Sequence, residues 1–292
     1  MKKIVLSALV ASSALMAEVI TVLPYAGTVH YDKDNAKSVK NTATVVGGYA
    51  SVGNLNYLLE MDYAHFDSQY KDPTLSNLKQ DDITLAYSRY FENFMVKIGD
   101  HYISSSDAQL GNGNTIMTAV EGYQWSGYNK LSVGLEGYYS RFAKGHDENY
   151  LTEKSISITQ LTPYVSWYQG IDHNWYNTLG AKINYEMAND YVKGHYFSYE
   201  LSDTLGYQNM FLKVGMQGGE MRTGVTNGGL TLVNTLDLMK REYNAKLGYY
   251  VTKNSVLSLT YTQRRYQEYV QGVGLAPQGT SSALIASASY SF

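Results

Sequence analysis

Apolar and polar residues alternate with a period of two along most of the chain. The clearest example is LNYLLEMDYAH, residues 55–65. One face of this segment holds Leu55, Tyr57, Leu59, Met61 and Tyr63, and the other holds Asn56, Glu60, Asp62 and Ala64 with Leu58. Successive side chains of an extended strand point to opposite faces, whereas helical spacing at i, i+3 and i+4 fits this segment badly. The pattern therefore predicts strands with one apolar and one polar face.

The same pattern recurs and predicts an all-β chain of about fourteen strands. Twelve strands is the next most favoured count, if the weaker segments 94–103 and 115–125 are misassigned. The predicted strands cover residues 19–31, 42–52, 55–66, 82–91, 94–103, 115–125, 130–142, 156–168, 175–187, 195–205, 209–218, 243–251, 255–266 and 281–292. Their order, with no helix between them, predicts an antiparallel up-and-down arrangement.

Short and long connections alternate between these strands. The short ones are SVGN, FEN, SGYN, QGIDHN, LGYQN and VTKN, all rich in turn-forming residues. The longest of the others lies at 219–242. An up-and-down meander places alternate connections at opposite ends, and a soluble sandwich has no reason to sort them by length. A closed transmembrane barrel does, because its periplasmic turns are short and its extracellular loops long.

Tyrosine is unusually common, with 29 Tyr beside 7 Phe and 3 Trp. Aromatic residues stand at every short connection and predict a girdle at the membrane surface, although tyrosine is also common in strands generally. Cysteine is absent, which excludes disulfides, cysteine-ligated metals and a thiol nucleophile. The formal net charge of −3 gives no argument for nucleic-acid binding.

The first residues, MKKIVLSALVASSALMA, predict a secretory signal peptide at 1–17, which leaves 18–292 as the barrel domain. Two lysines precede a short apolar run that ends in small residues, although Leu15 stands where a smaller residue is preferred. The alternative, a membrane anchor, requires a longer apolar run. No later stretch has the length and apolarity of a transmembrane helix.

The leader, the alternating strands, the sorted loops and the ending ASYSF together resemble a Gram-negative outer-membrane β-barrel of the porin-like type. The resemblance covers residues 18–292, identifies no subfamily and implies a location in the cell outer membrane. It also implies contact with outer-membrane lipid and lipopolysaccharide, and recognition of Tyr290 and Phe292 by the barrel-assembly machinery. A homo-oligomer is left open.

In such a barrel the last strand pairs with the first. We expect Leu284, Ala286 and Ala288 to face lipid and Ser287, Ser289 and Ser291 to face the lumen. Pro24 lacks an N–H for the ladder, so we expect it near a strand end or at a bulge.

Charged residues on the polar faces are candidates for the lumen lining. A basic residue that faces hydrocarbon near the bilayer midplane costs about 2–4 kcal/mol, so inward placement is favoured. The candidates are Glu60, Asp62, Lys97, Glu136, Lys182, Glu186, Glu200, Lys213 and Lys246. They predict a channel for passive diffusion of small hydrophilic solutes or ions, with no enzyme activity, cofactor or metal. Alternatively, these groups only pair across strands and fill the barrel. Loop 219–242 contains LTLVNTLDLMK and is apolar enough to fold inward as a constriction.

Two other functions remain open. The stretch KIGDHYISSSDAQ brings together Asp100, His101, Ser104, Ser105, Ser106 and Asp107, which are residue types that a lipase or protease at the barrel rim would use. A surface-binding or adhesin barrel of little conductance would instead use its long, charged loops. The other histidines, His30, His65, His146, His173 and His195, show no metal-ligand spacing.

Overall fold

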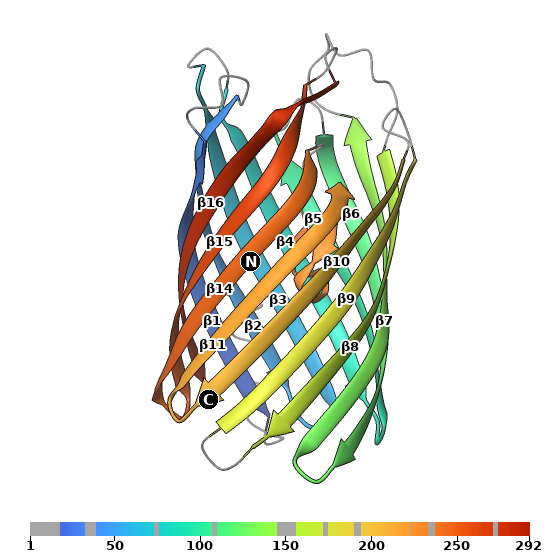
Figure 1. The fold of residues 1–292 in the computed structure, drawn as a ribbon, viewed down its shortest axis with the longest axis vertical. Helices are drawn as coiled ribbons and strands as arrows, with labels where there is room; N and C mark the ends of the chain where they lie inside the picture. The colour runs from blue at the N-terminus through green and yellow to red at the C-terminus, as the bar shows by residue number, and fades with distance from the viewer. Residues whose placement is uncertain are drawn as a thin grey trace, which may run out of the picture.

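In the computed structural model, the chain forms one closed barrel of fourteen antiparallel strands (Figure 1). The structure describes residues 18–32, 39–72, 76–106, 110–144, 156–171, 175–189, 194–222, 224–232, 237–270 and 274–292. The predicted signal peptide lies outside these residues. Each barrel strand pairs with its neighbours in sequence, and the first strand pairs with the last to close the wall. The fold predicted from the sequence is therefore confirmed.

The strands of the wall are, in chain order, β1 (Val19–Tyr31), β2 (Lys40–Gly53), β3 (Tyr57–Tyr70), β4 (Leu78–Tyr90), β5 (Phe94–Ser105), β6 (Leu110–Ser126), β7 (Asn129–Lys144), β8 (Ile156–Gly170), β9 (Trp175–Asn189), β10 (Gly194–Tyr207), β11 (Met210–Arg222), β14 (Leu238–Thr252), β15 (Ser255–Val270) and β16 (Gly274–Ser291). Between β11 and β14 lie β12 (Val225–Thr226), the short 3₁₀ helix η1 (Asn227–Gly229) and β13 (Thr231–Leu232). None of the helices in the described residues is long and apolar enough to cross a membrane.

Several strands extend further than predicted at the ends away from the short turns. In β3, for example, Asp67 still pairs with Thr44 and Ser68 with Ala43. Backbone pairing continues there although the apolar alternation has stopped. The hydrophobic pattern reports how far a strand is in contact with lipid, whereas the ladder of hydrogen bonds extends beyond it.

The two faces of the wall differ as the alternation predicts. In β3, Glu60 and Asp62 are 8% and 7% exposed, whereas the intervening Met61 is 42% exposed. Most of the large apolar side chains are exposed on the outside of the barrel, and many buried side chains are polar. This arrangement is the reverse of a soluble protein and suits a barrel surrounded by lipid.

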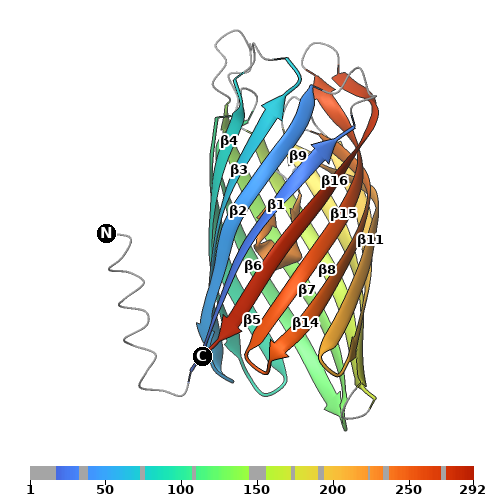
Figure 2. The same cartoon turned by 90° about the vertical axis from the view of Figure 1, so that its left-hand side faces the viewer.

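The turns that follow β2, β4, β6, β10 and β14 lie at the same end of the barrel as the C-terminus (Figures 1 and 2). In outer-membrane barrels, short turns mark the periplasmic end. We use that name for this end, and call the other the long-loop end.

The seam between β1 and β16 has the predicted faces. Leu284 pairs with Thr28 and is 47% exposed on the outside, and Ser287 pairs with Tyr25 on the inside. The backbone N–H of Phe292 donates to the carbonyl oxygen of Ile20 at 2.9 Å. The last residue therefore contributes a hydrogen bond to barrel closure.

Pro24 lies inside β1, so the prediction of a strand end or bulge is wrong. Its pairing with Gly48 of β2 is regular, while on the other side the pairs with β16 stop at Val22 and resume at Tyr25 in the same register. The missing proline N–H is thus accommodated by a local gap in one ladder.

Candidate functional site

The segment between β11 and β14 folds back into the barrel interior. Its described part, residues 224–232, is a small hairpin in which Val225 pairs with Leu232 and Thr226 with Thr231. We call it the lumen hairpin. Figures 1 and 2 show it in orange, enclosed by the wall in both views. The predicted inward fold of this loop is therefore present, although residues 233–236 of the apolar run lie outside the described residues.

The sequence NGG makes the tight turn of the lumen hairpin. Asn227, Gly228 and Gly229 all have positive φ angles, of 53°, 63° and 96°. Glycine adopts this region without steric cost, and asparagine is among the residues that tolerate it best. The turn therefore depends on the identity of these three residues.

The root of the hairpin is held by two buried side chains of the wall. The side-chain amide of Gln160, on β8, accepts from the N–H of Val225 at 2.7 Å and donates to its carbonyl at 2.9 Å. The carboxylate of Glu186, on β9, accepts from the N–H of Arg222 at 2.8 Å. Gln160 thus satisfies the backbone of Val225 as a neighbouring strand would.

The tip of the hairpin is held by β5. Lys97 Nζ donates to the carbonyl oxygen of Gly228 at 3.2 Å and to Glu60 Oε2 at 2.8 Å. His101 Nδ1 lies 3.2 Å from the carbonyl oxygen of Gly229 and 2.8 Å from Thr84 Oγ1. The side chains that bond to the tip and the root therefore lie on β5, β8 and β9.

An apolar cluster inside the barrel completes this attachment. Val225 packs with inward-facing residues of β4 to β8, and the cluster contains Ala86, Ile103, Met117, Tyr138, Phe142, Ile156 and Ile158. Sequence reasoning expected polar lumen faces and missed this cluster. The signal was present in ISITQL, where Ile156 and Ile158 stand on the face opposite Leu161. One part of the lumen is therefore a packed core.

The opposite part of the lumen is hollow. A cavity of about 590 Å³ lies between the hairpin residues Asn227, Leu230 and Thr231 and the wall. That wall consists of β1 to β4 and β14 to β16, away from the hairpin anchors on β5, β8 and β9. The hairpin is thus attached to one part of the wall and narrows the lumen from that side.

The cavity lining changes in character around the barrel. Acidic groups on β3 and β4 are followed by apolar residues on β2, β1 and β16, and then by basic groups on β15 and β14. The acids on β3 and β4 are Asp62 and Asp82, the apolar residues include Val45, Val29 and Ile285, and the bases on β15 and β14 are Arg264 and Lys246. The cavity is also lined by an ion pair of Lys40, on β2, with Asp237. A passing solute therefore meets charges of both signs and an apolar strip.

All nine predicted lining residues lie on the inner face of the wall, but they differ in what they contact. Lys97 binds Glu60, and Lys182 Nζ lies 3.0 Å from Glu136 Oε1. Glu186 holds the hairpin root, and Glu200 accepts from Asn184 at 2.9 Å. These six residues therefore have partners within the protein, as expected if charged groups pair across strands and fill the barrel.

The remaining three predicted residues face open space in the lumen. Asp62 accepts a hydrogen bond from the Tyr25 hydroxyl at 3.1 Å and lines the cavity with Lys246. Lys213 lies directly opposite Lys246 in the pairing of β11 with β14. Within the described residues, Lys213 and Lys246 have no ion-pair partner. A role of these groups in lining a channel stays a prediction.

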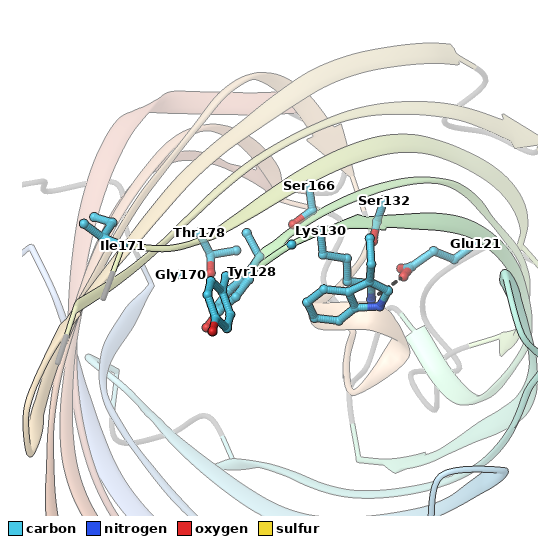
Figure 3. A pocket seen from close by; sticks show the side chains of 11 residues that line it. Glu121, Tyr128, Lys130, Ser132, Ser166, Gly170, Ile171 and Thr178 are labelled. Carbon is cyan, nitrogen blue, oxygen red and sulfur yellow. Dashed lines mark hydrogen bonds and ion pairs between the residues drawn. The ribbon is translucent and has the colours of Figure 1, made fainter. Parts of the chain in front are cut away.

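A second cavity, of about 720 Å³, lies toward the periplasmic end (Figure 3). It is lined by residues of β6 to β9 and their turns, among them Ser132, Ser166 and Thr178. Lys130 Nζ and Glu121 Oε1 are 3.3 Å apart beside it, as the dashed line in Figure 3 marks.

The aromatic residues at the short turns divide between the two faces of the wall. Trp175 and Tyr249 are exposed on the outside, as expected of a girdle, whereas Tyr49 lines the lumen cavity and Tyr168 the periplasmic one. Neighbouring positions of a strand point in opposite directions, so a cluster of aromatics around a turn supplies both faces. The predicted girdle therefore accounts for only part of these residues.

The residues proposed for a rim hydrolase are not assembled. His101 points inward to the hairpin, whereas Asp100, the next residue, points outward and accepts from the Asn114 amide at 2.7 Å. Ser104 has the same outward parity as Asp100. Asp107 lies outside the described residues. Strand alternation separates side chains that are close in sequence.

Comparisons with known proteins give a match of fold. No protein-family profile and no curated protein matches the chain. Among solved structures, the toluene transporter TbuX of Ralstonia pickettii is 8% identical with a TM-score of 0.52, over 96% of this chain and 91% of that one. The CymD monoaromatic hydrocarbon channel is 8% identical with a TM-score of 0.51, over 94% and 88%. CdiB from Acinetobacter baumannii is 10% identical with a TM-score of 0.52, over 94% and 60%.

This chain has the fold of an outer-membrane β-barrel. The result confirms the fold that the resemblance stated from the sequence implies. At 8–10% identity, the likeness carries the fold and no detail of the site.

Proposed function

We propose that the protein is a channel for passive diffusion of small solutes across the outer membrane, and that the lumen hairpin sets its bore. The observation that carries the proposal is the one-sided attachment of the hairpin. Its anchors lie on β5, β8 and β9, and a cavity of about 590 Å³ remains on the other side. A segment that served only to seal the barrel would have to fill that side as well.

The lining favours solutes that carry a polar or charged group. Asp62, Asp82 and Lys246 all face the cavity, and a bare hydrocarbon would displace their water without replacing its hydrogen bonds. The preferred class is therefore small hydrophilic solutes or ions, including solutes with an apolar part that fits the strip on β1, β2 and β16.

A second candidate is the passage of hydrocarbons. TbuX and CymD are named for toluene and for monoaromatic hydrocarbons. The apolar strip with Val29, Val45 and Ile285 is the observation that favours this candidate for the present chain. The charges on both flanks of the strip argue for the first class.

Swelling of proteoliposomes tests the proposal. We expect the intact barrel to admit glycerol faster than glucose, and glucose faster than raffinose. A variant with Val225–Thr231 replaced by a short Gly-Ser link should admit all three faster, with less discrimination by size. Equal swelling of protein-containing and protein-free liposomes, for both forms of the barrel, would overturn the channel assignment.

Several expected partners belong to this proposal. We propose that the barrel is surrounded by outer-membrane lipid, that its long-loop end contacts lipopolysaccharide, and that the assembly machinery recognises Tyr290 and Phe292. Tyr290 and Phe292 lie at the periplasmic end with ring centroids 4.8 Å apart, both on the outer surface. Exposed aromatic rings at this position support a recognition role. Adhesion through the long loops and a homo-oligomer remain secondary candidates.

A further inference from the structure

Two lysines face each other on the lumen wall, and neither has an ion-pair partner in the described part of the chain. Lys213 of β11 and Lys246 of β14 are directly opposite in register. Side chains so placed have Cβ atoms about 4.5–5.5 Å apart, and like charges in that position repel. The inward-facing acids of the adjacent strands β10 and β14 have partners of their own, since Glu242 binds Arg264 and Glu200 accepts from Asn184. An anion in the lumen would relieve the repulsion.

Threonine residues lie next to the two lysines on the adjacent strands, one on each side of the pair. Thr204 of β10 is opposite Lys213, and Thr260 of β15 is opposite Lys246. Thr178 of β9 is in turn opposite Thr204. Hydrogen-bond donors therefore form one row across five adjacent strands.

Aromatic rings form the adjacent row, one inward position nearer the periplasmic end. Tyr176 and Phe211 lie on either side of Gly206, and Phe211 is opposite Gly248. A Cβ atom on Gly206 would come within 1.9 Å of the Tyr176 ring, and one on Gly248 within 2.1 Å of the Phe211 ring. The rings therefore lie along the wall over the two glycines and present a face to the lumen.

The other side of the lysine pair is bounded by an amide. The side chain of Asn244 covers Gly215, where a Cβ atom would come within 2.7 Å of Asn244 Oδ1. The lysines thus lie between an amide and the ring of Phe211. Lys246 and Thr260 line the cavity beside the hairpin, and Thr178 lines the periplasmic cavity, so the donor row connects the two.

We propose that this wall binds small organic carboxylates, with the carboxylate on Lys213 and Lys246 and an apolar or aromatic body on Phe211 and Tyr176. The inference rests on the proposed channel function and names its substrate class. An inorganic anion would use the donor row but not the rings. A hydrocarbon would use the rings but leave both ammonium groups unpaired. A carboxylate with an apolar body uses both rows.

Binding to the purified barrel in detergent tests the site independently of conduction. Benzoate, acetate and benzyl alcohol serve as probes in isothermal titration. We expect benzoate to bind more tightly than acetate and benzyl alcohol not to bind measurably. The double variant K213Q/K246Q should lose about tenfold or more of the benzoate affinity, because hydrogen bonds to charged groups are lost. Phe211→Ala should weaken benzoate binding and leave acetate binding unchanged.

Lys130→Gln is the matched control, since Lys130 is a lumen-facing lysine that is already paired with Glu121. It should bind benzoate as the wild type does. Heat-dependent gel mobility establishes that each variant is a folded barrel, and K213Q alone provides a milder change. Benzoate affinity unchanged in the folded double variant would overturn the site, as would benzyl alcohol binding as tightly as benzoate. Equal affinity for acetate and benzoate would show that the site binds anions in general. That result would overturn the proposal that the rings bind the apolar part of the carboxylate.

The two proposals fail differently. Benzoate binding by a barrel that gives no liposome swelling would refute the channel and keep the site. Swelling with no benzoate binding would refute the site and keep the channel.

Discussion

Gly229 of the lumen hairpin is in contact with the side chain of Met117 on the barrel wall, so closely that a Cβ atom at Gly229 would lie 2.4 Å from Met117 Sδ. Met117 is 2% exposed and belongs to the internal apolar cluster, so it has little room to move. The position of the hairpin in the lumen therefore depends on a backbone contact that only glycine permits.

Gly229→Ala should displace the hairpin tip and raise the single-channel conductance. The substitution adds a side chain at a φ of 96° and against a buried neighbour. Gly228→Ala is the matched control, because nothing lies within 4 Å of a Cβ atom at that position. This substitution costs only the free energy of placing alanine in the left-handed backbone region, about 1–2 kcal/mol. Equal conductance of the two variants would show that the Met117 contact does not hold the tip.

Gln160→Leu should release the root of the hairpin. The change leaves the N–H and C=O of Val225 without partners in a buried site, at a cost of about 1–3 kcal/mol. The chain has no cysteine, so Val225→Cys provides a single thiol that reports undocking. We expect maleimide to label it about tenfold faster or more when Gln160→Leu is also present. Gln124→Leu, on an exposed outer position of β6, should leave the labelling rate unchanged.

Leu284→Lys should destabilise the barrel by about 2–4 kcal/mol if Leu284 lies near the bilayer midplane. Ser287→Lys is its partner experiment on the inner face of the same strand, beside the cavity. Urea-induced unfolding in lipid vesicles measures both. A larger loss of stability for the inner variant would contradict the assignment of faces at the seam.

Deletion of Phe292 should impair insertion of the barrel into the outer membrane. The deletion removes the hydrogen bond to Ile20 and an exposed ring at the end of the closing strand. The quantity of folded barrel in outer-membrane fractions measures the effect, with deletion of Asn77, near the long-loop end, as control. Normal insertion without Phe292 would remove its proposed role as an assembly signal.

The wall of the barrel was predictable from the sequence because lipid imposes a strict rule on every strand. Each lipid-facing position must be apolar, so Leu284 and its neighbours reveal both the strand and its orientation. Backbone pairing beyond the lipid is under no such rule. The sequence therefore predicts strands such as β3 to end several residues earlier, at the long-loop end, than they do in the structure.

The interior was less predictable, since the lumen imposes no single composition. Ile103 and Phe142 face inward although they are apolar, because the lumen hairpin covers them with Val225. Gln160 and Val225 are far apart in the sequence, and neither carries a pattern that indicates their contact. The sequence did show that loop 219–242 is apolar enough to enter the barrel, but not the side to which it attaches. The lysine pair became visible only through the register of β11 with β14.

Single-channel recording in planar bilayers tests the central claim most directly, by comparison of the intact barrel with the variant that lacks Val225–Thr231. The claim predicts discrete conductance steps for the intact barrel and steps several-fold larger for the variant. A barrel that is folded, inserted and free of current in both forms would contradict it.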